Sequence, residues 1–114
     1  KDIQHNLADF QRNPVISEEF RTNYTQILRA NFHSLVTLLA GTEAEQRLSH
    51  YETLQKEIRQ GYEWYLNETH QLPADKLRGD ELGSLLNLNR AVYLSFNALL
   101  EAARSVLAID TPGG

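Results

Sequence analysis

The chain has 114 residues, 41% of them hydrophobic and 23% charged, with a formal net charge of −4, which favours one soluble domain with a single core. Its 11 basic residues are scattered, so the basic patch that binds nucleic acid is missing. The lack of cysteine excludes disulfides, thiolate nucleophiles and zinc–thiolate sites. No apolar run approaches the ~20 residues of a membrane span.

The N-terminal segment is expected to be helical. Ile3, Leu7 and Phe10 recur at helical spacing, which predicts a short lead-in or linker helix over residues 1–13. Pro14 disfavours helical geometry at the residue before it, so the helix should end there.

A first long helix is predicted to follow. Ser17 is a suitable N-cap, and Gly41 is a natural C-terminal stop about seven turns later. The residues of its expected core face recur at intervals of three and four positions. They are Phe20, Tyr24, Ile27, Leu28, Asn31, Leu35, Leu38 and Leu39.

A second long helix is predicted from a capping box, in which Glu45 follows Thr42 by three residues. Spacings of four and three then indicate a heptad seam with the polar Gln55 at its centre, and Pro73 closes the segment. The seam consists of Ala44, Leu48, Tyr51, Gln55, Ile58, Tyr62 and Tyr65.

A third long helix is predicted to start between residues 74 and 82, where Gly79 and Gly83 weaken its first turns. It carries two seams offset by one residue, so we expect its wide apolar arc to contact two neighbours. The first seam is Leu82, Leu85, Asn89, Val92, Phe96, Leu99, Ala103 and Val106, and the second is Leu86, Tyr93, Leu100 and Leu107.

These elements predict an all-α fold. No stretch shows strand alternation, and the two short connections make successive helices antiparallel neighbours. We therefore expect a lead-in helix over 1–13, an up-down-up bundle of three long helices over 14–110, and a disordered tail at 111–114. The chain begins at Lys1 rather than Met and ends in DTPGG, which favours a domain cut from a longer protein.

The sequence predicts no enzyme, no metal and no cofactor. His33, His50 and His70 lack a histidine or acidic partner three or four residues further along their helices, and the acidic residues lack the repeated spacing of bundle metal sites. No nucleophile-elbow or phosphate-cradling glycine pattern is present. The aromatic group Tyr62, Trp64 and Tyr65 is typical of core and boundary packing.

The polar residues of the stretch LLNLNRAVYLSF supply the one indication of function. Asn89 falls within a seam, where a lone asparagine can fix helix register. Gln55 is the partner that we expect for it, since an unpaired buried amide costs about 1–3 kcal/mol. Arg90 would reach past the core to Glu52 or Glu57.

The predicted third helix also resembles a known family. The segment from 85 to 107, LLNLNRAVYLSFNALLEAARSVL, is similar to the last helix of PhoU-like domains, in particular those at the cytoplasmic C-terminus of bacterial sodium/phosphate cotransporter-family proteins. The likeness covers about the last 60 residues, more weakly over the second helix. The matching positions are Leu85, Leu86, Asn87, Asn89, Arg90, Tyr93, Ser95, Leu99 and Ala102.

The resemblance implies a non-catalytic regulatory or interaction domain, joined in one polypeptide to a membrane transporter on the cytoplasmic side of the bacterial inner membrane. PhoU proteins contain two three-helix repeats and this chain has room for one, so we expect a homodimer. The acidic E-x-x-x-D metal motifs of PhoU proteins are missing, so metal binding is not expected here. The residues expected to set core register and contacts are Gln55, Asn87, Asn89, Arg90 and Tyr93.

Two other interpretations stay open. The chain could be an extracytoplasmic helical sensor domain of a chemoreceptor or sensor kinase, which would have a membrane helix on each side. It could also be an enzyme or metal protein built on a helical bundle, which elemental analysis would reveal.

Overall fold

Helices make up all the regular secondary structure in residues 3–109, the part of the chain that the computed structural model describes, with side chains for residues 6–8, 10–73 and 75–109. The prediction of an all-α fold is confirmed for this part, and the tail predicted at 111–114 lies outside it. The elements are α1 (Ile3–Arg12), α2 (Glu18–Ala40), the short 3-10 helix η1 (Ala44–Gln46), α3 (Arg47–His70), the short 3-10 helix η2 (Ala74–Lys76) and α4 (Gly79–Val106).

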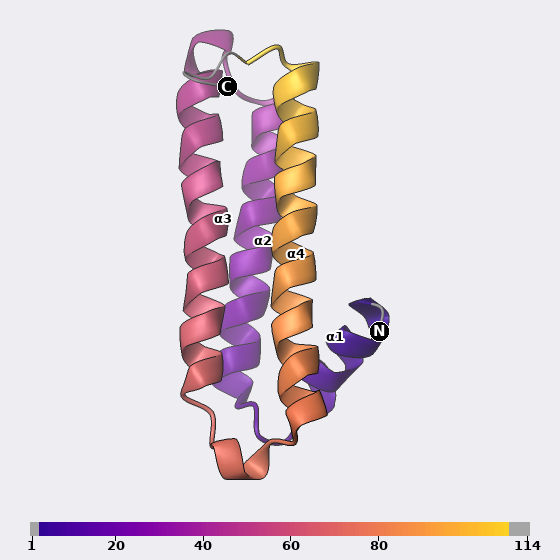
Figure 1. The fold of residues 1–114 in the computed structure, drawn as a ribbon. Helices are drawn as coiled ribbons and strands as arrows, with labels where there is room; N and C mark the ends of the chain where they lie inside the picture. Colours follow the sequence, from indigo (N-terminus) through magenta and orange to yellow (C-terminus); the bar gives the residue numbers. More distant parts are fainter. Residues whose placement is uncertain (1–2, 110–114) are drawn as a thin grey trace.

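The three long helices lie side by side, and each runs opposite to the one before it (Figure 1). The body is elongated, with extents of 51 × 25 × 23 Å, as expected for long helices that rise about 1.5 Å per residue. α3 packs along both α2 and α4, whereas α2 and α4 contact each other less. One side of the α2–α4 pair is therefore available to other elements.

Both predicted ends of α2 are confirmed. The Ser17 hydroxyl accepts a hydrogen bond from the Phe20 backbone N–H at 3.0 Å, so it caps the first turn. The helix ends at Ala40, and the N–H of Gly41 donates to the Thr37 carbonyl at 2.8 Å. These ends are set by local chemistry, which explains why the sequence located them.

The capping box predicted from Thr42 and Glu45 is wrong. The Thr42 hydroxyl donates to the Thr37 carbonyl at 2.9 Å and lies 2.9 Å from Nδ1 of His50. It holds the end of α2 instead of capping the next helix. A 3-10 turn intervenes, and α3 begins only at Arg47.

α4 begins at Gly79, within the predicted window of 74–82. One oxygen of the Glu81 carboxylate accepts from the Arg78 backbone N–H at 3.0 Å, which stabilises the first turn. The other oxygen accepts from the Asn13 side-chain amide at 2.9 Å. Glu81 thus ties the start of α4 to the α1–α2 loop.

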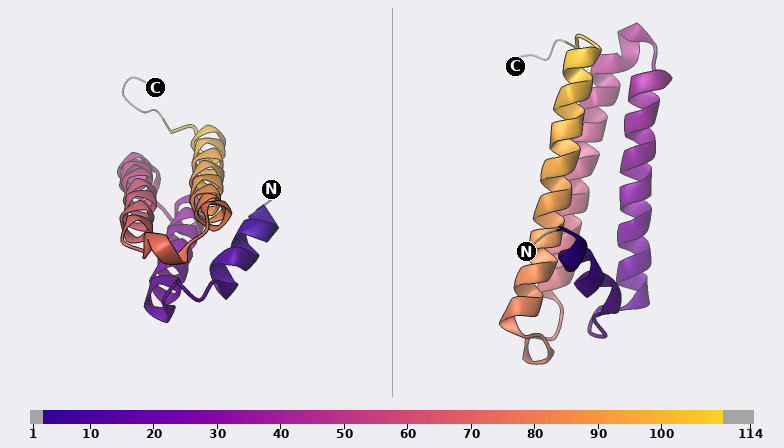
Figure 2. Two further views of the ribbon diagram at one scale, coloured as in Figure 1. Left: turned by 60° about the horizontal axis from the view of Figure 1, so that its bottom comes forward. Right: turned by 90° about the vertical axis from the view of Figure 1, so that its right-hand side faces the viewer.

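α1 packs on the bundle, across the base of the side formed by α2 and α4 (Figure 2). The Ser84 hydroxyl of α4 donates to the Asn6 side-chain oxygen at 2.9 Å, and both residues are buried. Phe10 is buried as well, and Nε of Arg21 donates to its carbonyl at 3.1 Å. The helix that the sequence suggested as a linker shares the core of the long helices.

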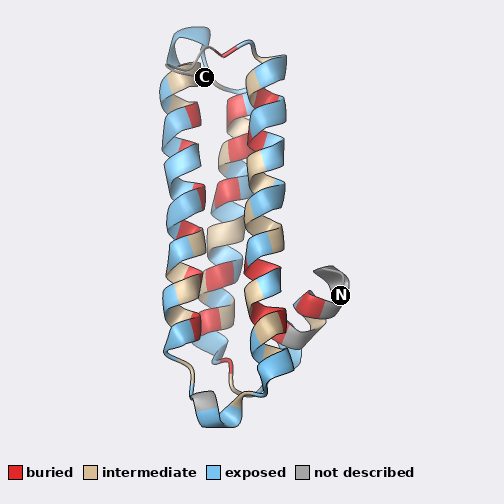
Figure 3. Cartoon of the chain, in the orientation of Figure 1, coloured by how far each residue is buried: buried red, intermediate tan, exposed pale blue. Residues whose placement is uncertain are grey.

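The buried residues of the long helices lie on the sides that face one another (Figure 3). Their apolar side chains form two clusters along the bundle. The upper cluster, near the α2–α3 loop, consists of Leu35, Leu38, Tyr51, Leu54, Ile58, Leu100, Ala103 and Ile109. The lower cluster, which includes α1, consists of Phe10, Ile16, Phe20, Tyr24, Tyr65, Leu85 and Leu88.

Candidate functional site

Two buried asparagines lie between the apolar clusters, and with Gly61 they form what we call the polar layer. Asn31 of α2 and Asn89 of α4 are 5% and 2% exposed. The Asn89 amide donates to the backbone carbonyl of Tyr62 on α3 at 3.1 Å. A Cβ placed on Gly61 would lie 3.8 Å from the Asn31 amide nitrogen, so these residues share one level. They line a cavity of about 10 Å³, close to the size of one water molecule.

Two buried tyrosines at this level and below it differ in their hydrogen bonding. The Tyr65 hydroxyl donates to the Leu85 carbonyl at 2.8 Å, whereas the buried Tyr24 hydroxyl has no hydrogen-bond partner among the described residues. Their rings lie 4.6 Å apart between centroids. Burial raises the pKa of both phenols, and the neighbouring Tyr24 raises that of Tyr65 further.

The predicted pairing of Asn89 with Gln55 is wrong. Gln55 is exposed, and the Asn89 amide donates to a backbone carbonyl instead. Tyr51, Ile58 and Tyr65 are buried as the predicted seam requires, but between them Leu54 and Gly61 face inward where Gln55 and Tyr62 were expected. Glycine contributes no hydrophobic signal, so the sequence pattern favoured the neighbouring row. The buried residues of α3 are Tyr51, Leu54, Ile58, Gly61, Tyr65 and Thr69.

The remaining predicted residues of α4 lie on different sides of the helix. Asn87 and Arg90 are exposed. The predicted ion pair from Arg90 to Glu52 or Glu57 is wrong, because no such pair forms among the described residues. Tyr93 is half-buried, and its ring stacks on that of Tyr62 with centroids 4.4 Å apart. The structure therefore places Asn89 and Tyr93 in contact with the same residue of α3, Tyr62. It leaves Asn87, Arg90 and Gln55 at the surface.

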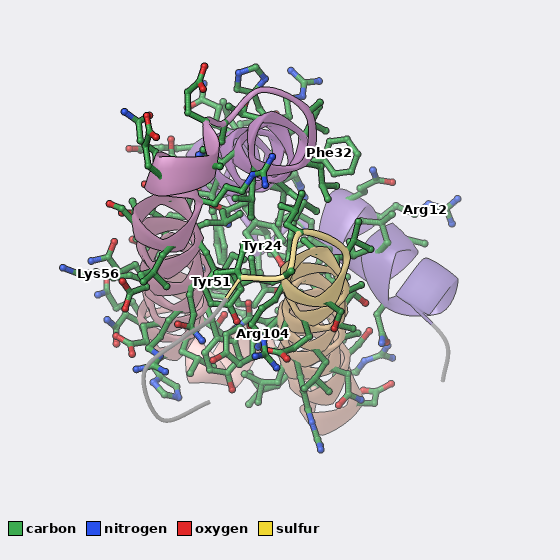
Figure 4. The ribbon with its side chains drawn as sticks, turned by 90° about the horizontal axis from the view of Figure 1, so that it is seen from above. Arg12, Tyr24, Phe32, Tyr51, Lys56 and Arg104 are labelled. Atoms are coloured by element: carbon green, nitrogen blue, oxygen red, sulfur yellow. The ribbon has the colours of Figure 1, made fainter. Side chains whose placement is uncertain are left out.

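Above α1, the α2–α4 side exposes a run of large apolar side chains, which we call the open face. Sequence reasoning found the wide apolar arc of α4 but not this shared surface, because its two halves come from distant parts of the chain. Figure 4 shows Phe32 projecting from α2 on the side of the bundle where α1 lies. The open face consists of Phe32 (57% exposed), Val36 (45%), Leu39 (46%), Leu99 (48%) and Val106 (77%).

The lower end of the open face is a groove between α2 and α4 that encloses about 340 Å³. Phe32 and Leu99 form its walls together with the half-buried Leu28 and Phe96, while the small Ser95 leaves room between them. The groove is almost wholly apolar, so it favours an apolar occupant over a polar small molecule.

The charges near the open face are unevenly distributed. Residues 20–42 and 82–100, which supply most of the α2 and α4 walls, contain no acidic residue, although the chain has 15 in all. Arg29 is the charged side chain that lines the groove. Three of the four acidic side chains of α3 are exposed instead, at Glu52, Glu57 and Glu63, and the fourth, Glu68, is half-buried. The net negative charge of the domain is thus concentrated away from the open face.

The described residues contain no group of three or more histidine or acidic side chains placed to hold a metal ion. Nor does any helix within residues 3–109 combine the length and apolar character that crossing a membrane requires. The buried polar layer and the open face are the two features that point to a role.

Comparisons of the chain with family models, with curated proteins and with solved structures find no match.

Proposed function

We propose that this chain is a non-catalytic interaction domain that regulates a sodium/phosphate cotransporter-like membrane protein, to which it is joined in one polypeptide. Its open face is the observation that carries the interaction role. Five large apolar side chains between 45% and 77% exposed lie along one side of two packed helices. An apolar surface of this kind, on an otherwise well-packed domain, is typical of a protein contact.

The cotransporter assignment rests on the sequence of α4. Among the positions that match the family, Leu85 and Asn89 are buried and organise the bundle, whereas Asn87, Arg90 and Leu99 are exposed. A motif that includes exposed apolar and charged positions is more than a packing pattern. It supports a surface role, and the family resemblance would put that surface at the cytoplasmic side of a bacterial inner membrane, next to the transporter domain.

The first test is the coding sequence on both sides of this chain. Several hydrophobic spans upstream, in two similar halves with Gly or Pro interruptions, are expected of a secondary transporter. A single span on each side would contradict the cotransporter assignment and favour a sensor domain. No span at all would contradict both membrane assignments.

The second test measures sodium-driven phosphate uptake by cells that express the whole parent protein. Leu99→Glu places a charge on the open face, and Leu94→Glu is the matched control. Leu94 is on the same helix and similarly exposed, at 54% against 48%, but it points about 140° away. We expect Leu99→Glu alone to change the uptake rate several-fold at equal amounts of membrane protein. Equal rates for both variants would overturn the regulatory role.

A further inference from the structure

The side of the bundle formed by α2 and α4 is divided into a covered half and an open half. α1 lies across the base half as a ridge, fixed by the Ser84–Asn6 and Asn13–Glu81 hydrogen bonds, both 2.9 Å long. Above it, the same sides of both helices continue as the open face (Figure 2). A single surface therefore carries a ridge at one end and an apolar groove at the other.

The ridge and the open half have similar lengths. α1 contains 10 residues, which is about 15 Å of helix, and Ser95 to Val106 spans about 16 Å along α4. Leu7 of α1 is 42% exposed and lies where the ridge meets the groove, beside Thr25 and Leu28. The ridge thus presents an apolar side chain of its own.

We propose that a second copy of this chain covers the open face, in an antiparallel two-fold dimer in which α1 of each copy fills the open half of the other. A two-fold axis perpendicular to the bundle places the base of one copy opposite the top of its partner. The ridge of each copy then meets the groove of the other. This inference rests on the proposed interaction role and names the partner of the same surface.

Area distinguishes a second copy from a single docked helix. The open face exposes on the order of 400 Å² of apolar surface, comparable to the largest patch on an ordinary monomer. A stable dimer buries roughly 800 Å² from each partner. The open half alone does not reach that area, so a stable dimer must also bury the ridge, which lies on the same side of the 51 Å long molecule.

Charge also permits two copies of an acidic chain to meet at this surface. The α2 and α4 walls lack acidic residues over 20–42 and 82–100, so this contact brings few like charges together. The exposed surface of α3, with Glu52, Glu57 and Glu63, faces away from the contact. The net charge of −4 per chain therefore comes from residues outside these two walls.

The test combines mass with cross-linking. Sedimentation equilibrium of the whole chain at tens of micromolar should give twice the 13.0 kDa chain mass. Leu99→Glu should reduce the mass to that of one chain, while Leu94→Glu should leave it doubled, with circular dichroism confirming that both variants are folded. A monomeric wild type, or a dimer that survives Leu99→Glu, would overturn the proposal. Neither result would decide the proposed function, which is tested separately by the uptake rates.

Introduced cysteines can report how the two copies are oriented, because the chain has no cysteine of its own. When Leu7→Cys chains and Leu99→Cys chains of different tag mass are mixed and oxidised, a disulfide between the two kinds of chain is expected, because the antiparallel arrangement brings these positions together. Leu39→Cys chains alone should not cross-link, since the two Leu39 residues lie at opposite ends of the dimer. Efficient cross-linking through Leu39, or none between the mixed chains, would contradict the arrangement.

Discussion

Gly61 allows α2 and α3 to approach closely, and its replacement by alanine should therefore destabilise the protein. An added Cβ would lie 2.8 Å from Cγ2 of Ile27, a methyl group held near the backbone of a helix in which β-branched residues have one preferred rotamer. Alanine favours a helix interior by about 0.8–1.0 kcal/mol over glycine, whereas overpacking costs about 1–3 kcal/mol. The net expectation is a loss of about 1 kcal/mol.

Thermal unfolding followed by circular dichroism measures this effect. A loss of about 1 kcal/mol lowers the Tm of a domain of this size by about 4 °C. The matched control is Gly83→Ala in α4, where an added Cβ meets nothing within 4 Å, so Tm should rise. In an Ile27→Ala background the obstructing methyl is gone, and Gly61→Ala should become stabilising. Equal gains from Gly61→Ala and Gly83→Ala in the wild type would refute the close approach of α2 and α3.

Three further predictions concern the polar and aromatic residues of the core. Tyr65→Phe should lower the free energy of unfolding by about 1 kcal/mol, because it removes the 2.8 Å hydrogen bond to the Leu85 carbonyl. Tyr24→Phe removes a hydroxyl with no hydrogen-bond partner in the described chain, so the free energy of unfolding measured in urea should stay the same or rise. Burial raises the pKa of both phenols in the folded protein. Their contribution to the free energy of unfolding is therefore complete below about pH 10, the pKa of tyrosine in the unfolded chain. Above that pH it is lost, by up to ~1.4 kcal/mol per pH unit for each tyrosine. In the Tyr24→Phe/Tyr65→Phe double variant, the free energy of unfolding should fall less steeply above about pH 10. An unchanged dependence on pH would contradict the role given to these two tyrosines. Asn89→Leu should raise Tm, because burying a leucine contributes about 1.5–3 kcal/mol against about 1 kcal/mol for the lost hydrogen bond. It should also disturb the assembly state, and an unchanged sedimentation mass would contradict a register role for Asn89.

The structure explains why the polar layer could be predicted only in part. Asn89 was recognisable because it interrupts an apolar row at helical spacing, and it is buried as predicted. Its acceptor could not be predicted, since the Tyr62 backbone carbonyl carries no sequence signal. Asn31 lies in a predicted seam as well, but only the packing of α2 on α3 places it beside Gly61.

The sequence by itself determined the helical class and several of the helix ends. Periodicity and caps act over three or four residues, so Ser17 and Gly41 marked α2 without any knowledge of its neighbours. Tertiary structure decided which residues lie inward between Tyr51, Ile58 and Tyr65 on α3, because Leu54 and Gln55 both flank this row and only packing against α2 and α4 selects between them. It also placed α1 on the base of the α2–α4 side, which leaves the remainder of that side open. Such surfaces combine residues far apart in the chain, and no local pattern records which helix faces meet.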